Sequence, residues 1–431
     1  MKSHVLRSLS LILVILLASV AVEASTAFTA AKGMKVLAGR NGDSGNLNIR
    51  MRVLPASAGK FGRVFLGADG GQGVGSFYNT TGMNDQGLWY GATSLYDGNA
   101  FPVRNDIKNY YNKPALDYDL VQYVMEICST VDEVIGYFTQ YYYPVWNGHH
   151  LFVDRNGDSV IIEFGEKDVV FIRRNGDHQV MTNFPNADTL NARWYNCWRY
   201  RTADCMLSEC QDISTEFFRS VCDAVHQGGK NPTSLSTVYD VTTGDLYVYY
   251  FHNYEEALVF NLYDELAKGE QYYSLPDYFR QTEANYPVRG ELVSPASVTF
   301  SWNGDAQGYD LYYSTDPKFT RATPIRTSTP VVPARSSMGF FVSCIGAVVL
   351  WVGIERRKRI FVLLSGVVMI ISFASCTLEN VVESPFAPSS IEHHVTVGNL
   401  QPNTQYYWKV VAQEPGDVRS QSSVQSFRTS D

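Results

Sequence analysis

Apolar residues are concentrated in three long runs along the chain, at 9–22, 338–354 and 360–376. The first run follows a basic start and ends in Val-Glu-Ala at 22–24, the small-residue pattern after which signal peptidase cuts. We therefore expect 1–24 to be a signal peptide and the protein to be exported, with Ser25 as its first residue after cleavage.

The two late runs are each about the length that a helix needs to span a bilayer. Only the basic stretch Glu-Arg-Arg-Lys-Arg, at 355–359, separates them. Because basic loops stay in the cytoplasm, the pattern predicts a transmembrane helical hairpin over 338–376 that contacts membrane lipid and anchors the chain. An alternative is that Phe-Ala-Ser-Cys, at 373–376, is a lipoprotein cleavage box, which would split the chain and lipidate Cys376.

Alternating apolar and polar positions predict strands on both sides of this hairpin. They occur at 298–302 and 309–314 before it and at 400–410 after it. These stretches resemble the early and late strands of a fibronectin type III sandwich, with Trp302 as the core tryptophan. We expect one sandwich, with halves at 290–335 and 390–431, that the hairpin interrupts and that closes outside the membrane.

Composition excludes some classes of partner and site. A hydrophobic content of 45% and a charged content of 18% are enough for sizeable cores, and the length suggests two or more domains. The net charge of −8 argues against a nucleic-acid partner. None of the seven cysteines is spaced C-x-x-C, which argues against zinc, while those at 197, 205, 210 and 222 are close enough in sequence for disulfides in an oxidising compartment.

Ser25 is the residue with the most distinctive chemistry. Cleavage after residue 24 would give it a free α-amino group beside its own hydroxyl. Such an amine titrates close enough to neutrality to take the hydroxyl proton. The position therefore predicts an N-terminal nucleophile that carries its own general base.

Four further motifs follow Ser25 in a fixed order. They are Gly-Arg-Asn-Gly-Asp at 39–43, Gly-Met-Asn-Asp-Gln-Gly-Leu at 82–88, Met-Thr-Asn-Phe-Pro at 181–185 and Arg-Tyr-Arg at 199–201. The ordered set resembles the choloylglycine hydrolase (linear amide C–N hydrolase) family of N-terminal-nucleophile enzymes, which includes bile salt hydrolases, penicillin V acylases and acyltransferase-like relatives. The resemblance covers roughly residues 25–285.

The resemblance implies a role for each motif residue. Arg40 would stabilise negative charge on the nucleophile, and Asp43 would accept a hydrogen bond from the α-amine. Asn183 would donate its side-chain amide to the oxyanion of the tetrahedral intermediate. Arg199 would complete the polar shell, with Arg201 as the competing assignment. The implied substrate-binding residues are Asn84, Ser94 and Arg201.

Two departures from the family pattern bear on activity. The family's nucleophile is normally cysteine, and a serine hydroxyl depends fully on the adjacent base. Ser94 stands where bile salt hydrolases carry an oxyanion-hole asparagine, which argues against bile-salt specificity. The alternatives are an inactive descendant that serves as a surface binding or scaffold protein, and an N-acyltransferase that uses the same site.

The expected fold is α+β. Residues 25–285 should form the four-layer αββα sandwich of N-terminal-nucleophile hydrolases, followed by the small all-β sandwich and the two-helix transmembrane hairpin. The expected reaction is hydrolysis of a small-molecule linear amide, such as an N-acyl amine or N-acyl amino acid, through an acyl-enzyme on Ser25. No cofactor is expected.

Overall fold

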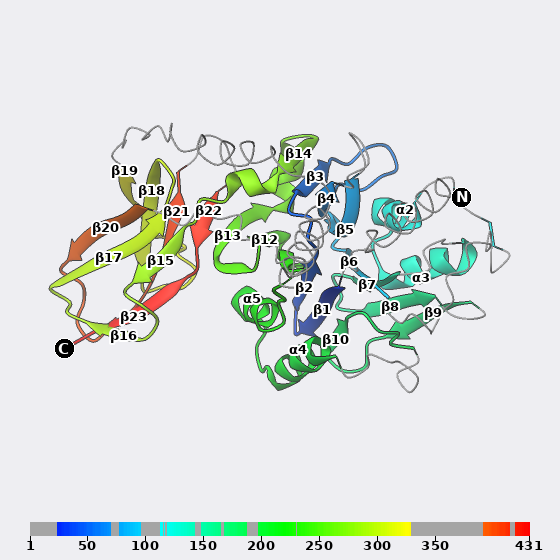
Figure 1. Cartoon of the computed structure of the whole chain (residues 1–431), viewed down its shortest axis with the longest axis horizontal. Coiled ribbons are helices and arrows are strands. Elements are labelled where there is room, and N and C mark those ends of the chain that lie inside the picture. Colours follow the sequence, from blue (N-terminus) through cyan, green and yellow to red (C-terminus); the bar gives the residue numbers. More distant parts are fainter. Residues whose placement is uncertain are drawn as a thin grey trace, which may run out of the picture.

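The computed structural model describes residues 24–69, 77–95, 113–114, 116, 119–142, 148–164, 168–187, 197–229, 231–328, 391–413 and 419–431. They form an N-terminal unit, residues 24–282, and a C-terminal sandwich built from strands on both sides of 329–390 (Figure 1). The hairpin expected at 338–376, Cys376 and the signal peptide up to residue 23 lie outside the described residues. Within these ranges, no helix is both long and apolar enough to cross a bilayer.

The N-terminal unit contains two antiparallel sheets. The first sheet has the strand order β10-β1-β2-β11-β12-β13, and the second has the order β14-β3-β4-β5-β6-β7-β8-β9. The strands of the first sheet are β1 (Ala24–Lys32), β2 (Lys35–Asp43), β10 (His178–Met181), β11 (Thr233–Asp240), β12 (Asp245–Tyr250) and β13 (Asn253–Asn261). Those of the second are β3 (Ile49–Leu54), β4 (Arg63–Asp69), β5 (Phe77–Asn84), β6 (Trp89–Ser94), β7 (Gly148–Val153), β8 (Ser159–Phe164), β9 (Val169–Arg173) and β14 (Gln271–Ser274).

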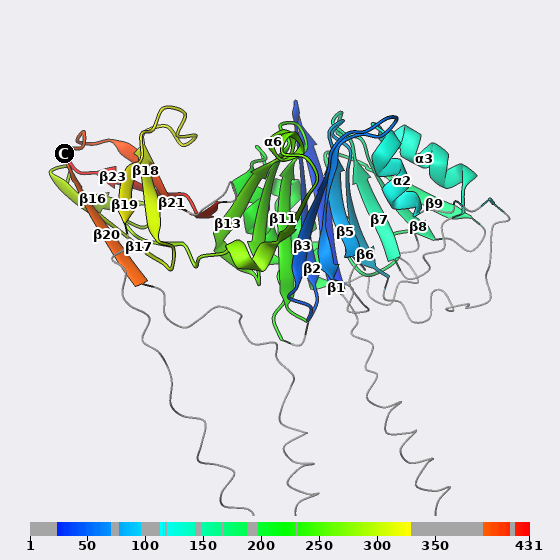
Figure 2. The same ribbon diagram turned by 90° about the horizontal axis from the view of Figure 1, so that it is seen from above.

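Helices cover the outer faces of both sheets (Figures 1 and 2). One apolar core lies between the sheets, a second lies under the helices of the first sheet, and a third lies under those of the second sheet. The first sheet is covered by α4 (Trp198–Glu209) and α5 (Thr215–Ala224), and the second by α2 (Leu120–Ile127) and α3 (Val131–Gln140). This is the αββα order of layers expected from the sequence, although strands far outweigh helices. A short helix, α6 (Leu262–Ala267), and a 3-10 turn, η1 (Leu275–Tyr278), complete the unit.

The alternation of side chains along β1 explains why both faces of the first sheet are buried. Ala27 belongs to the core between the sheets, whereas Phe28 packs under α5 against Phe218, with ring centroids 5.2 Å apart. Successive residues of a strand point to opposite faces. Ser25 therefore points to the same face as Ala27, toward the second sheet.

The C-terminal sandwich is formed by strands from both of the expected halves. Its apolar core includes Phe300, Trp302 and Tyr309 from before 329–390 and Trp408 and Phe427 from after it. Strand pairing also joins the two halves, because β17 pairs with β20 and β18 pairs with β21. The strands are β15 (Glu283–Tyr286), β16 (Glu291–Val293), β17 (Ser297–Gly304), β18 (Gly308–Ser314), β19 (Ile325–Ser328), β20 (Ile391–Gly398), β21 (Gln405–Ala412), β22 (Ser420–Ser422) and β23 (Gln425–Thr429).

The sandwich extends the first sheet of the N-terminal unit, because β22 pairs with β13. Glu256 of β13 is fully buried at this junction, and its Oε1 accepts hydrogen bonds from Arg280 N, at 2.6 Å, and from the hydroxyl of Ser420. Burial raises the pKa of the Glu256 carboxyl, and these hydrogen bonds oppose the rise. The two parts of the chain therefore share one continuous sheet.

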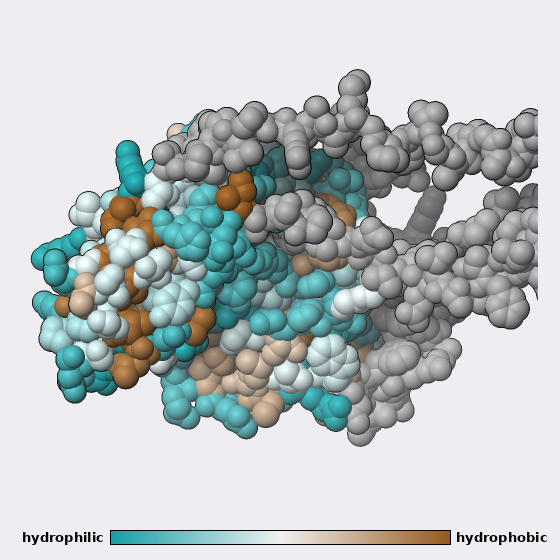
Figure 3. Space-filling model, turned by 60° about the vertical axis from the view of Figure 1, so that its left-hand side comes forward, coloured by the Kyte–Doolittle hydropathy of each residue, from teal (hydrophilic) through white to brown (hydrophobic). Residues whose placement is uncertain are grey.

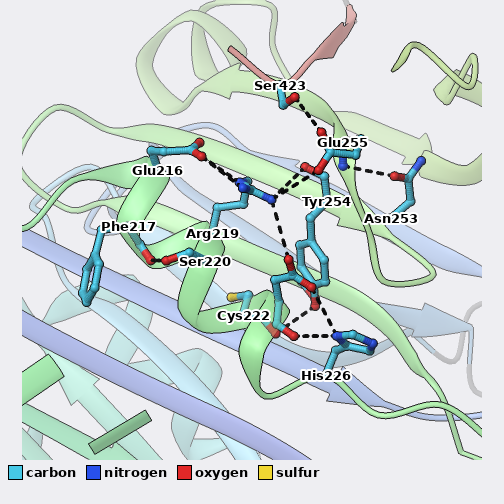
Figure 4. A network of polar contacts seen from close by, with 12 residues as sticks. Glu216, Phe217, Arg219, Ser220, Cys222, His226, Asn253, Tyr254, Glu255 and Ser423 are labelled. Atoms are coloured by element: carbon cyan, nitrogen blue, oxygen red, sulfur yellow. Dashed lines mark hydrogen bonds and ion pairs between the residues drawn. The ribbon is translucent and has the colours of Figure 1, made fainter. Parts of the chain in front are cut away.

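A second polar contact between the two parts runs over α5 (Figure 4). Arg219 of α5 pairs with Glu216, at 3.0 Å, and with Glu255 of β13, at 3.8 Å. Ser423, which follows β22, donates from its hydroxyl to the other carboxylate oxygen of Glu255, at 2.7 Å. The sandwich is thus connected through Glu255 to the helix that covers β2.

Some large apolar side chains are exposed, and the described cysteines form no disulfides. Figure 3 shows apolar side chains interspersed with hydrophilic ones on the face that it presents, and the exposed large apolar residues include Val288, Leu292 and Ile391. The described cysteines are free thiols, among them all four of the residues considered for disulfides. Burial raises the pKa of the Cys222 thiol strongly.

The buried His150 of β7 predicts an acid-sensitive fold. Burial, followed by the electrostatic interaction with His149, lowers the pKa of His150 from 6.5 to about 3. Between these values the unfolded chain binds a proton that the folded chain does not, so the free energy of unfolding should fall as the pH falls, by up to about 1.4 kcal/mol per pH unit. Urea titrations of wild type and His150→Leu between pH 7 and pH 4 measure this. A smaller slope is expected in the variant, and equal slopes would contradict the assignment.

Candidate active site

Ser25 lies near the start of β1, inside the first sheet, and only 2% of its surface is exposed. It pairs with Gly42 of β2, and its hydroxyl points into the space between the two sheets, because Ser25 shares a strand face with Ala27. Arg40 Nη2 donates to Ser25 Oγ at 3.3 Å. The structure therefore places a buried guanidinium group beside the expected nucleophile.

Arg40 lies on β2, the strand paired with that of Ser25, and its side chain extends toward the second sheet. Its Nε donates to Ala92 O, on β6 of the second sheet, at 2.9 Å. Gly42 leaves room for this path, because a Cβ at that position would lie 2.6 Å from Arg40 Nη1. A side chain at this position would have to displace the end of the Arg40 guanidinium group.

Asn183 follows β10 and contacts the backbone nitrogen of Ser25. Its Oδ1 accepts from Ser25 N at 2.9 Å, and its Nδ2 donates to Ser94 O at 2.7 Å. The resemblance implies that this Nδ2 donates a hydrogen bond to an oxyanion and that Asp43 accepts one from the amine. In the structure, Asn183 Oδ1 accepts the hydrogen bond from the nitrogen of Ser25. Of Ser94, the atom that takes part in this site is the backbone oxygen.

Arg199, in the first turn of α4, binds three parts of the site at once. Its Nη1 donates to Ser25 O at 2.6 Å and to Thr26 Oγ1 at 2.9 Å, and its Nη2 donates to Asn183 Oδ1 at 2.8 Å. It is 5% exposed, whereas Arg201 lies on the exposed face of α4. The structure therefore favours Arg199 over Arg201 as the arginine of the site.

Asp43 ends β2 in a buried polar environment. Its carboxylate accepts from Thr233 Oγ1 and Gln227 Nε2, each at 2.5 Å, and pairs with Arg199 Nη1 at 3.5 Å. Burial raises the pKa of this carboxyl, and the Arg199 guanidinium is the strongest opposing influence. Sequence reasoning missed Gln227 and Thr233, since no motif surrounds them and only the pairing of β11 with β2 brings them to Asp43.

Asn84 has a structural role instead of the substrate-binding role expected for it. Its Nδ2 donates to the backbone oxygens of Met125, at 3.1 Å, and Cys128, at 2.8 Å. Its Oδ1 accepts from the backbone nitrogens of Gln86, at 3.1 Å, and Leu88, at 3.0 Å. All four bonding positions of the amide are filled by backbone groups, so the side chain joins the turn after β5 to the end of α2.

This geometry predicts a large loss of stability in Asn84→Ala. The substitution leaves buried backbone groups without partners, which should cost about 2–4 kcal/mol of unfolding free energy. The exposed Asn48 provides the control, and Asn48→Ala should stay within about 0.5 kcal/mol of wild type. Chemical denaturation measures both, and equal stabilities of the two variants would contradict the structural role.

The site as a whole combines a buried hydroxyl with two guanidinium groups and one carboxylate. Such a cluster can stabilise negative charge that develops near Ser25 Oγ, because it is preorganised and shielded from water. In the described part of the chain, no group of three His, Cys, Asp or Glu side chains is arranged to hold a metal ion.

Comparison with known proteins gives one family and a set of structures. The family model described as "Purple acid Phosphatase, N-terminal domain" matches residues 288–429. It corrects the fibronectin type III assignment expected for the sandwich. No curated protein matches the chain.

Solved structures are similar to part of the chain. Two structures of conjugated bile acid hydrolase variants from Clostridium perfringens are 16% and 15% identical in sequence to this chain, and each has a TM-score of 0.47. The similarity covers 58% and 57% of this chain, and 96% and 95% of the two matched chains. Penicillin V acylase from Agrobacterium tumefaciens is 19% identical, with a TM-score of 0.40, over 52% of this chain and 82% of its own.

Proposed function

We propose that the chain is an amide hydrolase that acts through Ser25 after removal of residues 1–24. The observation that supports this most strongly is the buried cluster of Arg40, Asp43, Asn183 and Arg199 around a serine that directly follows a signal-peptide-like segment. A buried ion cluster is costly to maintain, and this one surrounds the single residue at which export would create a free amine. The motif resemblance to the choloylglycine hydrolase family points to the same class, with a linear amide as substrate.

In the proposed mechanism, cleavage removes Ala24, the strand partner of Asp43. The new α-amine then lies beside the Asn183 oxygen and becomes accessible to the Asp43 carboxylate. Two guanidinium groups nearby favour the neutral form of the amine, which is the form that accepts a proton. The amine takes the proton from Ser25 Oγ as that oxygen attacks the amide carbon.

Collapse of the tetrahedral intermediate breaks the C–N bond, and the α-amine passes its proton to the departing nitrogen. Water then attacks the acyl ester, gives its proton to the α-amine, and the proton returns to Ser25 Oγ as the acid leaves. Asn183 Nδ2 exchanges Ser94 O for the oxyanion, an interaction worth about 3 kcal/mol in comparable sites.

We also propose that the enzyme is exported and tethered to membrane lipid through 338–376. Amphiphilic amides would then be substrates that concentrate at the same surface. Alkaline carbonate extraction of membranes tests this: the full chain should stay with the membranes, and a chain lacking 338–376 should be released. Release of both would refute the tether.

The experiment that tests the proposed activity starts with the N-terminal sequence of the mature protein purified from an export-competent host. A start at Ser25 supports the mechanism, and any other start removes the base and refutes it. The mature protein is then assayed with N-acyl amino acids of increasing chain length, with and without an added amine. Release of free acid supports hydrolysis, transfer to the added amine supports the acyltransferase alternative, and no turnover supports the inactive scaffold.

A further inference from the structure

A second buried polar pair lies next to the site and takes no part in the mechanism above. His149 of β7 and Glu163 of β8 are 0% and 2% exposed, and His149 Nδ1 is 2.8 Å from Glu163 Oε1. Their neighbours along the strands, Leu151 and Ile161, belong to the core between the sheets. Both side chains therefore point toward the first sheet.

The hydrogen-bond partners of the pair indicate which of its atoms are donors. His149 Nε2 is 2.6 Å from Thr182 O, and a carbonyl oxygen only accepts, so Nε2 carries a proton. Glu163 Oε1 already accepts from Asn186 N at 2.7 Å, as a carboxylate oxygen does. His149 Nδ1 is then the donor to Glu163, and the ring carries both protons. With both ring nitrogens as donors, the pair would be an imidazolium and a carboxylate joined by a charge-assisted hydrogen bond.

The same pair holds both ends of the segment that carries Asn183. At one end, Thr182 O accepts from His149 and also from Thr93 Oγ1, at 2.5 Å. At the other end, the two carboxylate oxygens of Glu163 accept from the backbone nitrogens of Asn186 and Ala187, at 2.7 and 2.9 Å. Residues 182–187 follow β10, the edge strand of the first sheet, and side chains of the second sheet thereby hold them in place.

We propose that the His149–Glu163 ion pair is a positioning device that sets the place of Asn183 beside Ser25 N. The inference concerns Asn183 itself, and its consequence for catalysis rests on the function proposed above. An apolar pair would fill the same space but could not bind the polar backbone of this segment. Removing one partner of a buried ion pair leaves the other charge uncompensated. Each of the two residues is therefore needed for the segment to keep its place.

The experiment uses the mature full chain and the variants His149→Leu, Glu163→Gln and His150→Leu. His150 is the matched control, because it is the next residue on β7 and points to the opposite face, where its ring lies 6.4 Å from that of Tyr90. Two readouts need no enzymatic activity. They are the ring nitrogen signals of ¹⁵N-histidine-labelled protein at pH 7 and the side-chain amide signal of Asn183 in ¹⁵N-asparagine-labelled protein.

A third readout is the rate at which a fluorophosphonate probe modifies Ser25, separated into a maximal rate and a half-saturating concentration. In wild type we expect both ring nitrogens of His149 to be protonated. In His149→Leu and Glu163→Gln we expect the Asn183 signal to shift and the maximal rate to fall by about 100-fold, as for small misplacements of catalytic groups. The half-saturating concentration should be nearly unchanged. In His150→Leu the Asn183 signal should stay in place and the rate should stay within about twofold of wild type.

Three outcomes would overturn the inference. They are a singly protonated His149 ring in wild type, an Asn183 signal that is unchanged in both His149→Leu and Glu163→Gln, and an equal shift in His150→Leu. If His149→Leu does not fold, Glu163→Gln decides, since it keeps the volume of the side chain. A probe that leaves wild-type Ser25 unmodified would count against the proposed hydrolase, and the two spectroscopic readouts would still decide the positioning role.

Discussion

Replacing Ser25 by alanine is expected to reduce amide hydrolysis by about 1000-fold or more, because the variant keeps the α-amine but loses the attacking oxygen. The loss should appear in kcat, with little change in KM, since the hydroxyl acts mainly in the transition state. Steady-state kinetics on the mature protein measure both constants. Ser208→Ala is the control, because Ser208 lies on an exposed face of α4, where its hydroxyl donates to Cys205 O, at 2.8 Å.

The companion variant Ser25→Cys distinguishes an intact site from a decayed one. A thiolate forms more easily than an alkoxide, so the cysteine variant should be more active than wild type if the surrounding groups are functional. Amide cleavage by Ser25→Ala at the wild-type rate would refute the mechanism. An inactive Ser25→Cys would show that the site has decayed elsewhere and would favour the scaffold alternative.

The second large effect is expected for Arg199→Met. The substitution removes the opposing charge of the buried Asp43 and leaves Ser25 O, Thr26 Oγ1 and Asn183 Oδ1 without this donor. Breaking a buried ion pair from one side costs about 3–5 kcal/mol of unfolding free energy. Activity should fall with it, because the backbone oxygen of Ser25 and the side chain of Asn183 both lose a fixed neighbour. Denaturant titration and the rate of Ser25 modification measure the two effects.

Arg201→Met is the matched control for this prediction. It removes the same charge from the same helix, but from its exposed face, so stability and activity should change little, within about 0.5 kcal/mol for stability. If the two variants behave alike, Arg199 has no special role in the site. A larger effect of Arg201→Met would restore the competing assignment made from the sequence.

The contacts that sequence reasoning could anticipate best are those within the first hairpin. Ser25, Arg40 and Asp43 lie on two consecutive strands, β1 and β2, joined by a tight turn. Pairing of neighbouring strands follows from alternating patterns and a short connection. The identity of Ser25 as the first residue after export is likewise a property of the local sequence, and it stays a prediction.

Asn84 shows how a motif position can mislead. Within its turn it resembles a family motif, but the acceptors that fill its amide come from the end of α2, far along the chain. The orientation of the Asn183 amide could not be predicted either, because the sequence does not say whether its oxygen or its nitrogen faces Ser25. Only the positions of Ser25 N and Ser94 O decide which atom faces the nucleophile.

By itself, the sequence determined the strands of the sandwich, because alternation of apolar and polar positions is a local property. The layered α+β class of the N-terminal unit and the residues expected around Ser25 came from the order of the motifs and the family that they resemble. Tertiary structure alone decided between Arg199 and Arg201, which lie about 200° apart around one helix, and brought Gln227 and Thr233 to Asp43. It also placed His149 and Glu163 under residues 182–187. Each of these contacts joins segments distant in sequence, and a buried charge finds its partner only when the layers pack.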